Sequence, residues 1–193
     1  MQKAMGVDSP NYGWLTDEML VHDRAVHLGN LIHPKVEPEI GFLLSGSLGR
    51  HATSADVLDA TAAVFPCLEV VDSRYDGFRF GALDNIADNS SAGKVVLGEH
   101  AVTVTDIDLR TVGVVVKVDG ELAYSAAGAA ALDDPAEAVA WMARAVADRH
   151  RGLRAGDIVI SGGLTAPIDL YAGQTVRVDI DRIGSTSFRV TED

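Results

Sequence analysis

Three glutamates are placed where their carboxylates could act together. Glu37 and Glu39 stand two residues apart in a stretch of alternating character, residues 35–44, that predicts a β-strand. Residues i and i+2 of a strand point to the same face, about 6.6–6.8 Å apart along the chain. Two like charges at that spacing are unfavourable unless a positive group lies between them. Glu69 occurs in the apolar run 65–71, so its carboxylate is expected to be buried and to need a partner.

Three carboxylates without a thiolate or a paired imidazole form an oxygen-rich donor set, and such sets favour Mg²⁺ or Mn²⁺ over Zn²⁺. None of the six histidines has the spacing of a metal-ligand pair. Spacing alone also fits a second interpretation, in which Glu37 and Glu39 form the solvent face of an amphipathic strand. Pro38 between them cannot donate a hydrogen bond to a neighbouring strand, which predicts an edge strand or a bend at this point.

The composition limits the class of protein. A chain of 193 residues fits about one domain. It carries 28 acidic and 16 basic residues, a net charge of −12, which repels phosphate backbones and disfavours nucleic-acid binding. No apolar run approaches the roughly 20 residues that span a bilayer, and the N-terminus has no signal-peptide core, so no membrane partner is expected. A single cysteine, Cys67, excludes an internal disulfide and fits a cytoplasmic location.

The elements that must position the glutamates predict an α+β fold, in which a mixed sheet is rolled or stacked as a β-sandwich with a few flanking helices. Alternating apolar residues predict strands at these positions: 35–44, 67–72, 111–125 (a hairpin around Asp119-Gly120), 158–161, 175–181 and 187–190. The Asn/Asp/Ser/Gly-rich stretch 79–98 predicts mostly loop. Residues 1–34 are irregular and are interpreted as an N-terminal arm, and residues 35–193 as the metal-binding domain.

Two helices are predicted. One begins at Thr53, which has capping-box spacing to Asp56, and would bury an apolar stripe from Val57 to Phe65. The other begins at Pro135, after an aspartate at the N-cap position.

Five motifs together resemble one family. Residues 33–42 (HPKVEPEIGF) resemble the metal-binding strand of the fumarylacetoacetate hydrolase superfamily, in the branch of the 2-hydroxypenta-2,4-dienoate (2-oxopent-4-enoate) hydratases and 4-oxalocrotonate decarboxylases. Further segments resemble signatures of that branch, in the expected order: 68–75, 86–93, 155–164 and 183–187. The resemblance implies the fold of the superfamily's C-terminal domain, a mixed β-sandwich or rolled sheet.

The resemblance also implies roles for residues. Glu37, Glu39 and Glu69 would ligate one Mg²⁺ or Mn²⁺, which would chelate the 2-oxo and carboxylate oxygens of a 2-oxo acid and stabilise a dienolate. The implied catalytic residues are Asp72, Arg74 and Asp88. The implied substrate-binding residues are Asn89, Ser91, Gly162, Gly163 and Leu164. Structural alternatives stay open: a salt bridge for the 72–74 pair, turn capping for the 88–89 pair, and a tight turn for the glycines.

The implied function is that of a lyase in meta-cleavage degradation of aromatic compounds. Decarboxylation of 4-oxalocrotonate to 2-oxopent-4-enoate is favoured, with Arg74 or Arg79 contacting the second carboxylate of the substrate. The alternatives are hydration of 2-oxopent-4-enoate to 4-hydroxy-2-oxopentanoate, and a non-catalytic partner subunit. The last is considered because relatives usually carry a longer N-terminal region with a lysine near the substrate, of which residues 1–34 would be a remnant. A homo-oligomer and a complex with the partner hydratase or decarboxylase are also expected.

Overall fold

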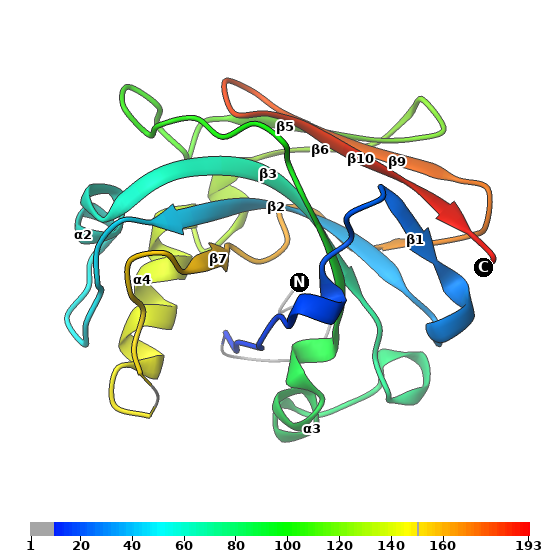
Figure 1. Ribbon diagram of the computed structural model, residues 1–193, viewed down its shortest axis with the longest axis horizontal. Coiled ribbons are helices and arrows are strands. Elements are labelled where there is room, and N and C mark those ends of the chain that lie inside the picture. The colour runs from blue at the N-terminus through cyan, green and yellow to red at the C-terminus, as the bar shows by residue number, and fades with distance from the viewer. Residues whose placement is uncertain (1–9, 150) are drawn as a thin grey trace.

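The computed structural model describes residues 10–149 and 151–193, so the first nine residues of the expected arm lie outside the described part. Two five-stranded sheets face each other (Figure 1). One has the strand order β1-β10-β9-β5-β6, and the other has the order β4-β3-β2-β7 with β8 also pairing with β2. The predicted α+β sandwich is confirmed.

The strands have these bounds: β1 Ala25–His27, β2 Lys35–Leu44, β3 Thr61–Val71, β4 Ala92–Leu97, β5 Gly113–Val118, β6 Glu121–Ala127, β7 Ile158–Ile160, β8 Ile168–Asp169, β9 Thr175–Ile180 and β10 Gly184–Thr191. The helices have these bounds: α2 Ser54–Asp59, α3 Ala82–Ala87 and α4 Pro135–Val146. Short 3₁₀ turns complete the described elements: η1 Asp17–Met19, η2 Leu28–Asn30, η3 Asp76–Phe78, η4 Asn89–Ser91 and η5 Gly128–Ala130.

Strand β2 contributes to two different regions, because successive side chains of a strand point to opposite faces of the sheet. Val36, Ile40, Phe42 and Leu44 share one face and are buried in the hydrophobic core. Facing residues of the other sheet, such as Val178, are equally buried. The opposite face of β2 carries Glu37 and Glu39, which are also buried. The strand predicted for residues 35–44 is confirmed with the same bounds.

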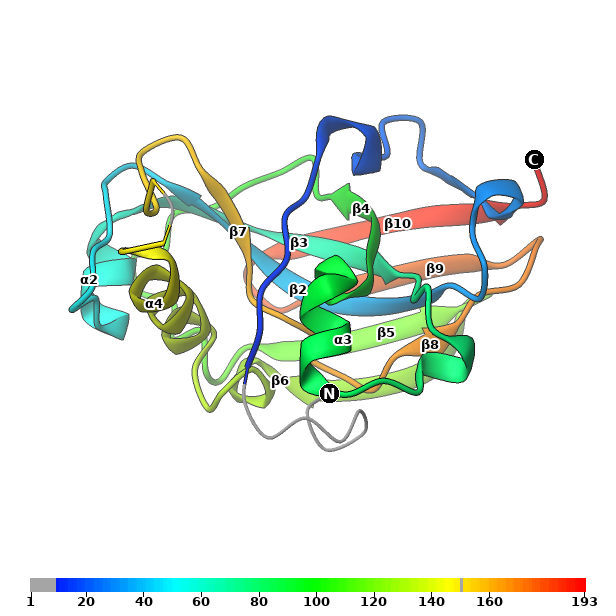
Figure 2. The same cartoon turned by 90° about the horizontal axis from the view of Figure 1, so that it is seen from below.

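The glutamate-bearing face of the β2–β3 sheet is flanked by α3, α4 and the start of the described chain. In Figure 1 these elements lie below the sheet, and in Figure 2 the N-terminal segment crosses between α4 and α3. Helix α4 begins where the sequence predicts, because the Asp134 carboxylate accepts a hydrogen bond from the Ala136 amide at 2.9 Å and Pro135 occupies the first turn. Val139, Ala143 and Val146 of α4 are buried.

The helix predicted from Thr53 is shorter than expected. Its capping box is present, with the Asp56 amide donating to Thr53 Oγ1 and the Thr53 amide donating to Asp56 Oδ2. However, α2 ends at Asp59, and the residues predicted as the end of its stripe, Thr61 to Phe65, start the long strand β3. Pairing with β2 outweighs the local helical period, because β-branched and aromatic side chains suit a buried strand.

Two further expectations are corrected by long-range pairing. The stretch 79–98 is not mostly loop, because it contains α3 and the strand β4, which pairs with β3. Pro38 is not on an edge strand, since β2 has β3 on one side and β7 and β8 on the other. Pro38 falls between the residues that pair with β8 and those that pair with β7, and its carbonyl accepts from the Leu164 amide at 2.9 Å.

A glycine in β2 lets a neighbouring aromatic ring lie flat on the strand. A Cβ on Gly41 would lie 2.2 Å from a Phe65 ring carbon, on the strand paired with it. We therefore expect Gly41→Ala to lower the free energy of unfolding by about 1–3 kcal/mol, the usual cost of overpacking. Urea denaturation measures the change. The control is Gly113→Ala, also in a strand, where no atom lies within 4 Å of the added carbon; an equal loss in both variants would contradict the interpretation.

Candidate metal centre

Antiparallel pairing of β2 with β3 brings the three glutamates together. Glu37 lies directly opposite Glu69, and Glu39 lies opposite Cys67. Directly paired residues project to the same side of a sheet. Each glutamate offers a carboxylate oxygen within 4.8 Å of the other two. The group predicted from spacing and family resemblance is therefore assembled by strand register.

The carboxylates are buried with few partners. Glu37 and Glu39 are 0% exposed, which excludes their interpretation as a solvent face. Glu39 Oε2 accepts from the Gly162 amide at 2.8 Å. Both carboxylate oxygens of Glu37, and Oε1 of Glu39, have no hydrogen-bond partner among the described residues. Buried oxygens of this kind are costly unless a cation or a proton satisfies them.

Burial raises the pKa of all three carboxyl groups, and repulsion adds to the shift for Glu37 and Glu39. Burial, and then the charge of Glu69, raises the pKa of Glu37 to about 8. Burial also raises the pKa of Glu39 well above its ordinary value, with added repulsion from Glu69 and Glu37. Burial likewise raises the pKa of Glu69. Without a counter-charge the cluster therefore holds protons near neutral pH, and a divalent cation would displace them.

The loop after β7 packs tightly on this cluster. A Cβ on Gly163 would lie 2.7 Å from Glu37 Oε2, so only glycine fits there without displacing the carboxylate. Gly162 has a φ of +84°, a left-handed conformation that aims its amide at Glu39. Ser161 Oγ accepts from the Ile40 amide at 3.2 Å, which ties the loop to β2. Leu164 is buried in the core and does not line the pocket.

A pocket of about 560 Å³ opens over Glu39 and Glu69. Its walls come from four separate parts of the chain: residues 10–15, the α3–η4 region, the middle of α4 with residues 130–132 before it, and residues 151–163. Most of the wall away from the carboxylates is apolar, with Leu132, Trp141, Met142 and Ile158 as large side chains. An oxygen-rich floor below an apolar wall suits a small acid that binds a metal at one end.

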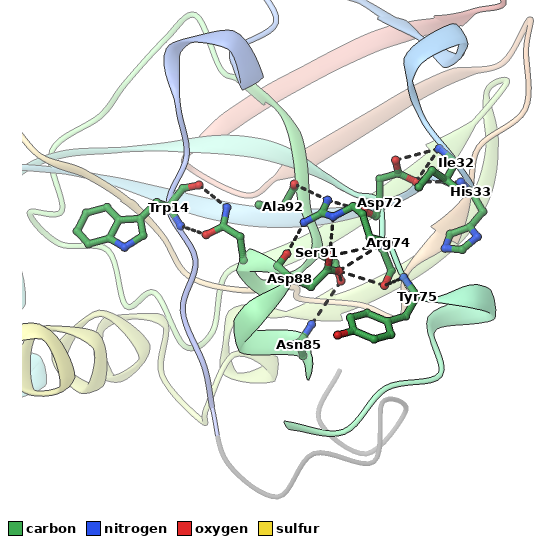
Figure 3. A network of polar contacts seen from close by, with 12 residues as sticks. Trp14, Ile32, His33, Asp72, Arg74, Tyr75, Asn85, Asp88, Ser91 and Ala92 are labelled. Carbon is green, nitrogen blue, oxygen red and sulfur yellow. Dashed lines mark hydrogen bonds and ion pairs between the residues drawn. The ribbon is translucent and has the colours of Figure 1, made fainter. Parts of the chain in front are cut away.

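Three of the implied catalytic residues form a hydrogen-bonded network beside the pocket (Figure 3). Arg74 Nε lies 2.5 Å from Asp88 Oδ1, and Arg74 Nη1 donates to the carbonyls of Asp72 and Ala92. The Asp72 carboxylate accepts from the amides of Ile32 and His33 at 2.9–3.1 Å. None of these three residues lines the pocket. The contacts that the structure shows for them are the hydrogen bonds within the protein given above. Their catalytic roles stay predictions.

Only some of the implied substrate-binding residues reach the pocket. Gly162 and Gly163 line the pocket, whereas Asn89 and Ser91 do not. The pocket wall instead contains their neighbours Asn85 and Ser90, and the Ser90 hydroxyl is buried with no hydrogen-bond partner in the described chain. Sequence reasoning missed both because the motif 86–93 marks the turn without showing which side chains face inward.

The cation expected near the second carboxylate of a substrate is also placed differently. Arg74 is engaged with Asp88, and Arg79 pairs with Asp76 on the surface, so neither reaches the pocket. Arg151 is the only cationic residue of the described chain in the pocket wall, and it lies 2.5 Å from Asp157 Oδ1. No sequence signal distinguishes Arg151 from the other arginines around it.

Comparisons with known proteins agree with this geometry. The fumarylacetoacetate (FAA) hydrolase C-terminal family model matches residues 6–191. A 4-oxalocrotonate decarboxylase of Pseudomonas sp. (strain CF600) is 40% identical over 187 residues, covering 96% of this chain and 71% of that protein. A 2-keto-4-pentenoate hydratase of Burkholderia vietnamiensis (strain G4 / LMG 22486) is 38% identical, covering 100% of this chain and 74% of that protein.

A solved structure shows the same likeness. The 4-oxalocrotonate decarboxylase from Pseudomonas putida G7, complexed with magnesium and adipate, superposes with a TM-score of 0.91 at 37% identity. The match covers 98% of this chain and 73% of that chain. No helix in the described residues is long and apolar enough to cross a membrane.

Removing one carboxylate charge tests the metal centre. We expect Glu37→Gln or Glu69→Gln to weaken Mn²⁺ binding about a hundredfold, roughly 2.7 kcal/mol, because each variant replaces a charged ligand by a neutral amide of the same shape. Titration calorimetry measures the affinity. The matched control is Glu121→Gln on the exposed edge strand β6. Unchanged affinity in both site variants, with the fold intact by circular dichroism, would show that the metal binds elsewhere.

The raised pKa values predict a pH dependence of stability. The ordinary pKa is 4.5 and the folded value for Glu37 is about 8, so the folded state binds extra protons between these limits. The stability of the metal-free protein should therefore be greatest below pH 4.5, as far as these groups are concerned, and fall as pH rises through 8. Added Mg²⁺ should raise Tm more at pH 8 than at pH 6. Scanning calorimetry in EDTA and in Mg²⁺ measures Tm at each pH. In Glu37→Gln, the effect of Mg²⁺ on Tm should depend less on pH. A Mg²⁺ effect that is the same at both pH values would contradict the assignment.

Proposed function

The chain belongs to the fumarylacetoacetate hydrolase family, and from this we propose that it is a divalent-metal-dependent lyase of aromatic meta-cleavage degradation that decarboxylates 4-oxalocrotonate to 2-oxopent-4-enoate. The observation that carries the proposal is the cluster of three glutamates below a pocket. Glu39 and Glu69 line that pocket, and Glu37 and Glu39 hold buried oxygens without a hydrogen-bond partner among the described residues. The solved decarboxylase relative is a complex with magnesium and adipate, a six-carbon dicarboxylate like the proposed substrate.

Glu37, Glu39 and Glu69 would hold the Mg²⁺ or Mn²⁺ ion. Their oxygen-only donor set and their unpartnered oxygens fit such an ion. When bound, the ion supplies Lewis-acid stabilisation to the negative charge that develops on the 2-oxo oxygen of the substrate. The Gly162 amide fixes one oxygen of Glu39 and leaves the other free, which sets the direction in which that carboxylate can bind.

The apolar wall fits a reaction in which charge leaves one end of the substrate. Loss of CO₂ breaks the bond between C5 and C6 of 4-oxalocrotonate and leaves the electron pair in the conjugated chain, so negative charge moves toward the 2-oxo end. Trp141, Met142 and Ile158 surround the other end with apolar surface. An environment that solvates a carboxylate poorly favours its conversion to neutral CO₂. No free cation in the described wall opposes this, because Arg151 is paired with Asp157.

Hydration of 2-oxopent-4-enoate is the second candidate, and one residue favours it. Addition of water needs a group that positions the water beside the dienol. The buried Ser90 hydroxyl in the pocket wall can donate and accept, and it has no hydrogen-bond partner within residues 10–149 and 151–193. The curated relatives include hydratases at nearly the same identity as the decarboxylases. Both reactions use the same three carboxylates.

The proposal includes a cytoplasmic location, a homo-oligomer, and a complex with the partner hydratase or decarboxylase. Cys67 is a buried free thiol, as suits a reducing compartment. Leu83 and Ile86 on α3 are 81% and 55% exposed, and apolar side chains presented side by side on one helix suit a subunit contact.

The reaction is tested by supplying both substrates to the purified chain with Mg²⁺. We expect CO₂ from 4-oxalocrotonate above a blank of buffer and metal, and at least a hundredfold less CO₂ from Glu37→Gln, because the variant lacks one metal ligand. Loss of the ultraviolet band of 2-hydroxypenta-2,4-dienoate without CO₂ would replace decarboxylation by hydration. No turnover of either substrate would contradict both and favour a non-catalytic partner subunit. The control variant is again Glu121→Gln.

A further inference from the structure

The first described residues form one wall of the pocket. Residues 10–15, here called the strap, line the pocket along their whole length. Figure 2 shows the strap crossing the glutamate-bearing face of the sheet between α4 and α3. On the α4 side, the ring of Tyr12 lies 6.5 Å from that of Trp141. The strap therefore closes a site whose floor belongs to a distant part of the sequence.

One side chain fastens the strap on the α3 side. Asn89 Oδ1 accepts from the Trp14 amide at 2.7 Å, and Asn89 Nδ2 donates to the Trp14 carbonyl at 2.8 Å (Figure 3). Both ends of one amide group thus bind the two main-chain groups of one residue, as a neighbouring strand would. Asn89 is not in the pocket wall, so its amide is committed to Trp14.

The strap and the turn at Asn89 also touch through their backbones. A Cβ on Gly13 would lie 2.4 Å from the Asn89 carbonyl oxygen, a distance that real Cβ atoms do not reach. Gly13 therefore permits the close approach on which the two Asn89–Trp14 hydrogen bonds depend. The same Cβ would lie 3.1 Å from Asn89 Oδ1, so Gly13→Ala disturbs both the backbone contact and the Asn89 side chain, starting from the strap.

The turn that carries Asn89 is strained. Asn89, Ser90 and Ser91 have φ values of 54°, 57° and 61°. The left-handed conformation is unfavourable for residues other than glycine, although asparagine adopts it more readily than serine. Each side chain has a different task. Asn89 binds the strap, and Ser91 Oγ donates to Asp88 at 2.9 Å. The Ser90 hydroxyl is buried in the pocket wall with no partner in the part of the chain that the structure describes. Contacts on both sides hold a conformation that would otherwise relax.

We propose that Asn89 is a positioning residue of the site: by binding Trp14 it holds the strap over the carboxylate cluster and fixes the turn that presents Ser90 to the substrate. Its effect on the substrate passes through Trp14 and Ser90 and not through a contact of its own. The substrate part of this inference rests on the proposed function, whereas the link between Asn89 and the strap does not.

The test compares two substitutions that differ in backbone preference. Asn89→Ala removes both hydrogen bonds and keeps a residue that resists a positive φ, whereas Asn89→Gly removes the same bonds and accepts that φ. The chain has two tryptophans, so Trp141→Phe leaves Trp14 as the only one, and acrylamide quenching of its fluorescence then reports on the strap. Gly13→Ala disturbs the same contact from the strap. The matched control is Asn30→Ala at an exposed position.

In the Trp141→Phe parent, we expect Asn89→Ala, Asn89→Gly and Gly13→Ala each to raise the quenching constant of Trp14 at least twofold. In the same variants without Trp141→Phe, KM for 4-oxalocrotonate should rise at least fivefold, and Mn²⁺ affinity should stay within twofold of the unsubstituted protein. Asn30→Ala should change none of these values. An unchanged KM together with a raised quenching constant of Trp14 would show that the strap does not act on the substrate.

Two other results would overturn the proposal. If Asn89→Gly behaves like the parent and only Asn89→Ala is impaired, the turn conformation matters and the bonds to Trp14 do not. If neither substitution changes quenching, Asn89 does not hold the strap. If the unsubstituted protein turns over neither substrate, only the proposed function is contradicted. The quenching measurements then test the link between Asn89 and the strap without any measurement of activity.

Discussion

The interaction on which this structure depends is the repulsion among three carboxylates that strand pairing forces together out of water. Glu37 and Glu69 face each other across an antiparallel ladder, and Glu39 joins them on the same side. A protein core tolerates such a group only with a counter-charge or with protons. Among the described residues, the surrounding structure supplies a single amide, from Gly162, and no hydrogen-bond partner for the other oxygens of Glu37 and Glu39. That deficit, and not an excess of ligands, is what makes the site receptive to a divalent ion.

The rest of the fold supports this arrangement. The opposite face of β2 is buried among the apolar residues of the second sheet, which prevents the strand from shifting register and turning the glutamates outward. Pro38 and the glycines at 162 and 163 are tolerated because β7 and β8 each pair with only part of β2 and leave a gap for the loop. Arg74 and Asp88 stabilise the neighbouring turn and keep their charges away from the cluster.

Features set by short-range patterns could be predicted from the sequence, and those set by distant contacts could not. Residues 35–44 alternate clearly, so the strand and the shared face of its glutamates were predictable. The end of the helix after Thr53 was not, because only pairing with β2 makes Thr61 and Val64 part of a strand. The residues of the pocket walls could not be predicted either. Ser90, Trp14 and Arg151 are ordinary residue types whose importance comes from segments that are remote in sequence and adjacent in space.

The walls of the pocket come from four separate segments, while the floor comes from a single pair of strands. This division has an evolutionary consequence. Substitutions in one wall can alter what fits above the ion, or where water is admitted, and leave the ligands and the strand register untouched. A lineage can therefore exchange one reaction for another in small steps, each of which passes through a folded protein that still binds metal. Decarboxylases and hydratases at almost equal sequence distance from this chain are the outcome expected of such divergence.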